Sequence, residues 1–175
     1  MEKVNYGHLI SVSGRSPQQV KRYALAFCGV DPNASGGRGI TREYEINDGF
    51  YIYLIGVLVA DYGMQLGEAK SHIYRIIPEL DTRGLLPSIR WDRRDPVPRI
   101  VLRIYPGHVY EYRTYIKRTP DETENWDTGE QNVDDPYVAR WVPKGKIGDA
   151  TPGPVFEVPL TAYLGHYILT LRGQV

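Results

Sequence analysis

Polar and cationic side chains gather at the start of one predicted helix, between residues 15 and 22. A glutamine amide can form two hydrogen bonds with adenine, and lysine or arginine can bind guanine or a backbone phosphate. When a helix lies in the major groove of DNA, its first residues usually meet the base edges. We therefore expect a nucleic-acid contact made by Arg15, Ser16, Gln18, Gln19, Lys21, Arg22 and Tyr23.

A second candidate segment follows, in which glycines alternate with cationic residues. Three glycines lie between residues 36 and 39, where they allow the backbone to approach a duplex closely. Arg38 and Arg42 supply positive charge for phosphates or for the minor groove, and Tyr44 follows them. The alternatives are a glycine-rich loop without a partner, an arginine paired with a neighbouring glutamate, and packing roles for Tyr23 and Tyr44.

The charges are distributed unevenly along the chain. Lys and Arg number 21 and Asp and Glu number 21, so the net charge is zero. Residues 1–42 nevertheless carry a net charge of +4, whereas residues 119–136 carry −7. A DNA-binding surface needs local positive potential rather than a basic whole chain, and the N-terminal block meets this requirement. The acidic block predicts an exposed loop.

Helices are required to hold the residues of the first segment in place. Ser16 is a good N-cap and Pro17 suits the first helical position, so we expect a helix from Pro17 to Phe27. Its apolar residues at helical spacing form a stripe that should be buried. The other elements expected in this half are a short helix over 6–13, a strand over 40–46, a helix over 50–62 capped by Asn47 or Asp48, and a helix over 66–80 that Pro78 should kink or end.

From residue 90 onward the pattern changes to alternating apolar and polar residues. Residues 99–104 and 109–117 flank the turn Tyr105-Pro106-Gly107-His108 and predict a hairpin. We also expect a strand over 137–142 and a terminal helix over 160–172.

Three motifs in the first half occur in a fixed order. A basic-aromatic pair ends the sequence Val20-Lys21-Arg22-Tyr23, and Gly39-Ile40-Thr41-Arg42-Glu43-Tyr44 follows it. An apolar helix, Gly63, and a leucine-x-glutamate-aliphatic restart at Leu66 come next. With one extra residue before Arg42, this order resembles the DNA-binding domain of the mercury-resistance-regulator (MerR) family and its excisionase-like relatives. The resemblance covers residues 9–77.

This resemblance implies a winged helix-turn-helix with its second helix in the major groove and its wing on the backbone or minor groove. Together with the later pattern it predicts an α+β fold in two domains. Residues 1–86 would form the winged helix-turn-helix, all-helical apart from a short wing hairpin. Residues 87–175 would form a β-rich region with a C-terminal helix and a dimerisation or effector role. The function expected is that of a transcriptional regulator that binds specific double-stranded DNA sequences.

We expect a homodimer, because a single module of this kind reads only a few base pairs. Several prolines between residues 87 and 98 leave no room for the long dimerising helix of the resembling family. The candidate interfaces are the tyrosine-rich hairpin at 99–117 and the helix at 160–172. The alternative is that the hairpin tyrosines pack in the core of their own domain.

Other classes of function have weaker support in the sequence. The four histidines and Cys28 show no metal-ligand spacing, and no catalytic triad is recognisable, so we expect neither an enzyme nor a cofactor. No export signal or membrane span is evident, which favours a cytoplasmic location. Two alternatives stay open: an assembly protein that uses a helix-turn-helix as a scaffold, and a small-molecule sensor or enzyme with its site in the C-terminal part. The sequence indicates no particular ligand.

Overall fold

A computed structural model describes residues 3–29, 43–91, 99–107, 109–117, 137–144 and 153–173. The chain divides into two compact units, of which the first comprises residues 1–94 and 163–175 and the second residues 95–162. Helices occur together with antiparallel strands, in agreement with an α+β class. Among the helices described, none has both the length and the apolar character needed to cross a bilayer.

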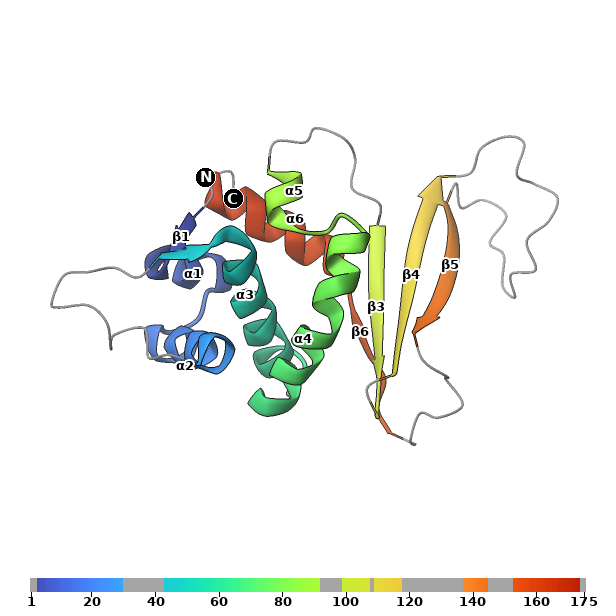
Figure 1. The fold of residues 1–175 in the computed structure, drawn as a ribbon, viewed down its shortest axis with the longest axis horizontal. Coiled ribbons are helices and arrows are strands. Elements are labelled where there is room, and N and C mark those ends of the chain that lie inside the picture. The colour runs from blue at the N-terminus through green and yellow to red at the C-terminus, as the bar shows by residue number, and fades with distance from the viewer. Residues whose placement is uncertain are drawn as a thin grey trace, which may run out of the picture. The chain divides into compact units, whose positions relative to one another are not determined.

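The first unit is a group of helices around α3 (Figure 1). Its elements are β1 (Lys3–Asn5), α1 (Tyr6–Ser13), α2 (Pro17–Cys28), β2 (Glu43–Glu45), α3 (Ile46–Ala60), α4 (Leu66–Thr82), α5 (Pro87–Arg90) and α6 (Leu160–Leu171) from Tyr163 onward. Helix α2 begins at Pro17, as predicted. Helix α6 agrees with the predicted terminal helix to within one residue.

Helix α3 forms the centre of this unit, because every residue from Gly49 to Leu58 is buried. A helix that is apolar on all sides needs neighbours on all sides. Helix α2 covers one side, where the ring of Tyr23 lies directly over Gly56. Helix α6 covers another, where the Tyr167 hydroxyl donates a hydrogen bond of 3.0 Å to the Ile46 carbonyl. Figure 1 shows α3 between these two helices.

The terminal helix therefore packs with the N-terminal half, which differs from the domain boundary expected at residue 86. Tyr167 is fully buried, and its ring centroid lies 5.3 Å from that of Phe50 and 5.8 Å from that of Tyr53. Burial raises the pKa of the Tyr167 phenol well above its usual range, so the hydroxyl remains a donor. The apolar stripe of α6 was recognisable, but the surface that it covers was not.

The strand before α3 ends at Glu45, one residue earlier than predicted. Strand β2 pairs antiparallel with β1, with Val4 opposite Tyr44. Neither β1 nor this pairing was expected, and the predicted wing segment from Gly36 to Arg42 lies outside the described part of the chain. The predicted cap of α3 at Asn47 or Asp48 is wrong, because the helix already begins at Ile46 with Glu45 as N-cap.

Pro78 does not end α4, which continues to Thr82. The helix continues past Pro78 because Ile73, Ile76 and Leu80 are all buried on one side. This burial outweighs the loss of one backbone hydrogen bond near the end of the helix.

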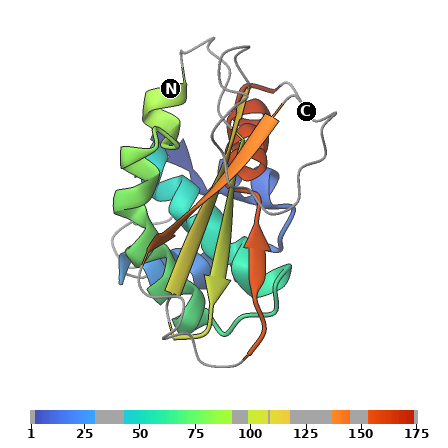
Figure 2. The same cartoon turned by 90° about the vertical axis from the view of Figure 1, so that its right-hand side faces the viewer.

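The second unit is built on an antiparallel sheet. Its strands are β3 (Arg99–Tyr105), β4 (Val109–Lys117), β5 (Tyr137–Lys144) and β6 (Phe156–Val158), in the order β5-β4-β3-β6. The strands lie side by side in Figure 2. The predicted hairpin is confirmed, with Leu102 opposite Tyr112 and Gly107 at a φ of +81° in the turn. The predicted strand at 137–142 is also confirmed and extends to Lys144.

Two of the three hairpin tyrosines are unsuited to an exposed dimer interface. Tyr110 is 6% exposed and Tyr112 is 1% exposed, so both are buried within the chain itself. The side chain of Tyr115 lies outside the described part. Burial of these rings supports the alternative in which the tyrosines stabilise their own chain.

Candidate nucleic-acid interface

Two helices joined by a short turn carry most of the candidate residues. Helix α1 ends at Ser13, and its C-cap Gly14 has a left-handed φ of +60° and an N–H that donates to the Ile10 carbonyl at 2.9 Å. Three residues, from Gly14 to Ser16, separate α1 from α2. The hydroxyl of Tyr6 donates to the Pro17 carbonyl and so joins the start of α1 to the start of α2. Partial burial raises the pKa of the Tyr6 phenol, which keeps this donor protonated.

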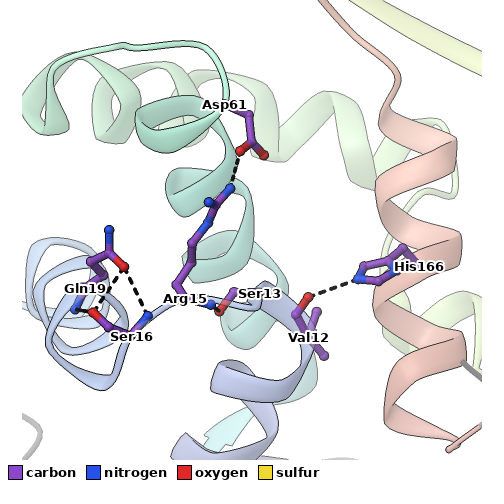
Figure 3. Close-up of polar contacts among 7 residues, drawn as sticks. All are labelled: Val12, Ser13, Arg15, Ser16, Gln19, Asp61 and His166. Atoms are coloured by element: carbon purple, nitrogen blue, oxygen red, sulfur yellow. Dashed lines mark hydrogen bonds and ion pairs between the residues drawn. The ribbon is translucent and has the colours of Figure 1, made fainter.

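A reciprocal capping box fixes the first turn of α2 (Figure 3). The Gln19 N–H donates to Ser16 Oγ at 3.4 Å. In return, Gln19 Oε1 accepts from the Ser16 backbone N–H at 3.0 Å and from Ser16 Oγ at 3.1 Å. The box satisfies donors that a helix start otherwise leaves without an intrahelical partner. Ser16 and Gln19, both candidates for DNA contact, are thus engaged in holding the helix.

Helix α2 has one buried side and one exposed side. Val20, Tyr23 and Ala24 are buried against the unit. Gln18 and Arg22 are exposed on the other side, and Lys21 beside them is partly exposed. The predicted division of the helix into a packing stripe and an outward polar surface is confirmed at these positions.

Arg15 has a structural partner. Its guanidinium forms an ion pair and hydrogen bond with the carboxylate of Asp61, which follows the last residue of α3 (Figure 3). This pair ties the turn before α2 to the end of the central helix. Because Asp61 neutralises its charge, Arg15 is a weaker candidate for a phosphate contact than Arg22.

The two candidate tyrosines are buried in the core, which favours the alternative of packing roles for both over contacts with DNA. Tyr23 is 4% exposed, and its ring would lie 3.1 Å from a Cβ placed at Gly56. Tyr44 is also 4% exposed and sits on β2 opposite Val4. A side chain buried to this extent stabilises the fold and cannot reach a duplex without unfolding part of the unit.

The segment that carries Arg38 and Arg42 lies outside the described residues, so their predicted contacts stay predictions. Both ends of that segment are defined. Helix α2 ends at Cys28 with Gly29 as its left-handed cap, and β2 begins at Glu43.

The electrostatics of the α1–α2 segment favour an anionic partner. From Asn5 to Gly29 the sequence holds three cationic residues and no carboxylate. On the outward surface of α2, Arg22 is exposed and Lys21 beside it is partly exposed.

The described histidines take part in local contacts. His8 Nδ1 accepts from the Asn5 N–H at 3.2 Å in the capping box of α1, and His166 Nε2 lies 3.0 Å from the Val12 carbonyl. His72 is buried within 3.6 Å of Glu68. In the part of the chain that the structure describes, no group of three His, Cys, Asp or Glu side chains could hold a metal ion.

Sequence reasoning identified Ser16 as a cap but missed the role of Gln19, although the Ser-x-x-Gln pattern of a capping box was readable. The Arg15–Asp61 pair had no readable signal, because 46 positions separate the two residues. Comparison of the chain with protein-family models, curated proteins and solved structures found no match.

Proposed function

We propose that this chain is a transcriptional regulator that binds specific double-stranded DNA sequences. In this proposal α1 and α2 form a helix-turn-helix, α2 is the recognition helix, and the basic glycine-rich segment from Gly36 to Arg42 is the wing on the backbone or minor groove. The observation that carries the proposal is the outward surface of α2. It presents Gln18, Lys21 and Arg22 on a segment without a carboxylate.

The dimensions and chemistry of α2 support this assignment. The major groove is about 12 Å wide and admits one α-helix, and there each base pair shows its own pattern of donors and acceptors. Gln18 is the second residue of α2, at the end that usually meets the bases. The Tyr6 hydrogen bond, the Arg15–Asp61 pair and the capping box hold this end in place, which reduces the ordering cost of binding.

The proposal includes a homodimer, because one module of this size makes few base contacts. It also includes a cytoplasmic location. A palindromic preferred site and a mass of two chains per duplex, measured by sedimentation, are the expected results.

The direct test is duplex binding by the full chain as a function of salt. Fluorescence anisotropy with a labelled random-sequence duplex should show an affinity that falls steeply as salt rises. Arg22→Gln should weaken this binding and lower the magnitude of the salt slope by about one if Arg22 contacts a phosphate.

A matched control is Arg172→Gln, which makes the same charge change at the residue that follows the last residue of α6. Arg172 is exposed and lies 4.8 Å above the ring of Trp91. We expect this variant to bind as the wild-type chain does. Absence of duplex binding at low salt, or equal losses in the two variants, would refute the proposed function.

A further inference from the structure

The two neighbouring glutamines at the start of α2 differ in what their side-chain amides can do. A glutamine that reads adenine must accept a hydrogen bond through its oxygen while it donates one through its nitrogen. An amide oxygen has two lone pairs. In Gln19 both are in use, because Oε1 accepts from the Ser16 N–H at 3.0 Å and from the Ser16 hydroxyl at 3.1 Å. Gln19 could read adenine only by breaking the capping box.

The side-chain amide of Gln18 takes no part in the capping box. Its side chain is exposed and makes no hydrogen bond to the residues that the structure describes. Arg22 is also exposed and has no ion pair within the same residues. The two positions are four residues apart in α2, so their side chains lie one above the other on the same side of the helix.

The spacing of this pair can be compared with the spacing of bases. Four residues of α-helix rise about 6 Å, and successive base pairs rise about 3.4 Å. Two side chains one helical turn apart therefore reach bases about two steps apart when the helix runs along the groove. A helix that crosses the groove obliquely brings them to adjacent steps.

We propose that α2 reads DNA through Gln18 and Arg22 alone, with Gln18 on an adenine and Arg22 on a guanine one or two base pairs away. This inference rests on the proposed function and names its substrate, a duplex in which an A and a G occupy those neighbouring positions. Lys21, which is less exposed, contributes charge toward the backbone.

Two adjacent substitutions with the same charge change separate the roles of the glutamines. Glutamate is the usual partner in a capping box, so Gln19→Glu retains the acceptor that Ser16 requires. Gln18→Glu places the same negative charge one residue earlier and removes the amide that would read adenine. Arg22→Lys keeps the positive charge but loses the planar fork that binds guanine O6 and N7 together.

The experiment is selection of bound duplexes from a randomised pool by the full chain, followed by affinity measurements on the selected site and its single-base variants. We expect the wild-type site to contain the A and the G, each preferred over the other bases by about 5- to 150-fold. Gln18→Glu should lose the preference for A, and Arg22→Lys should lose the preference for G. Gln19→Glu should keep both preferences at a uniformly lower affinity and keep the wild-type melting temperature.

The outcomes distinguish this inference from the function on which it rests. Salt-dependent binding without a base preference, or a preference that changes with Gln19→Glu and not with Gln18→Glu, would overturn the inference and leave duplex binding in place. No binding to any duplex at low salt would overturn both.

Discussion

The packing of α6 over the start of α3 can be tested by adding one methyl group at Gly49. A Cβ at this position would come within 3.0 Å of both Tyr167 Oη and Val4 Cγ2, whereas carbon atoms normally approach to about 3.5–4.0 Å. Neither neighbour has room to withdraw, because Tyr167 and Val4 are both fully buried. The hydrogen bond of Tyr167 to the Ile46 carbonyl restrains the ring further.

Favourable and unfavourable contributions together set the change in the free energy of unfolding for Gly49→Ala. Alanine is better than glycine inside a helix by about 1 kcal/mol. Overpacking a core costs about 1–3 kcal/mol, and a buried hydrogen bond displaced with the Tyr167 ring costs about 1–3 kcal/mol more. The net expectation is a loss of about 3 kcal/mol in the free energy of unfolding, since the unfavourable terms exceed the helical gain. For a chain of this length that corresponds to a Tm lower by about 10 °C.

Thermal unfolding followed by circular dichroism measures this effect, and Gly165→Ala is its control. Gly165 lies in the same helix as Tyr167, and a Cβ there would meet no atom within 4 Å. This variant should be unchanged or more stable by up to about 1 kcal/mol. In a Tyr167→Phe background, which lacks the hydroxyl, Gly49→Ala should cost less than in the wild-type chain. A Gly49→Ala chain as stable as the wild type would refute the packing of α6 on α3.

Three other structural features lead to testable predictions. Ser16→Ala removes the hydroxyl that caps α2 and should lower the free energy of unfolding, measured in urea, by about 1 kcal/mol. An unchanged urea midpoint would contradict this expectation. Asp61→Asn breaks a partly exposed ion pair at a cost of at most about 1 kcal/mol. It also frees Arg15, so affinity for a random-sequence duplex should rise at low salt, and a fall would contradict the assigned pairing. Burial raises the pKa of Tyr51 to about 12, above the value of about 10 for an unfolded tyrosine. The buried neutral phenol of Tyr51 therefore makes its full contribution to the free energy of unfolding below about pH 10. Above that pH the free energy of unfolding falls by up to about 1.4 kcal/mol per pH unit as the pH rises toward 12. Phenolate absorbance and circular dichroism should change together in that window, and full phenolate formation near pH 10 with the helices intact would contradict the expectation.

The elements that the sequence predicted well are those determined by neighbouring residues. Ser16 and Pro17 define the start of α2 because a cap and a first-turn proline act within four positions. The β3–β4 hairpin was equally readable, since its turn and its alternating strands are contiguous.

The elements that were missed depend on contacts between distant parts of the chain. Strand β1 has only three residues and is defined by its pairing with β2, about 40 positions later. The candidate interface also depends on a contact between distant positions. Arg15 and Arg22 carry the same charge in the sequence, and the position of Asp61 at the end of α3 distinguishes them.

The presentation of α2 depends on residues at both ends of the chain. Tyr23 attaches α2 to α3 over Gly56, and Tyr167 attaches α6 to the first residues of the same helix. A chain cut after residue 86 would retain every candidate DNA-contacting residue but would uncover the side of α3 that Tyr167 closes. Exposing the apolar surface beside Phe50 and Tyr53 would destabilise the helix on which α2 rests. The residues that would read DNA are therefore local in sequence, whereas the support that orients them is completed only by the last helix.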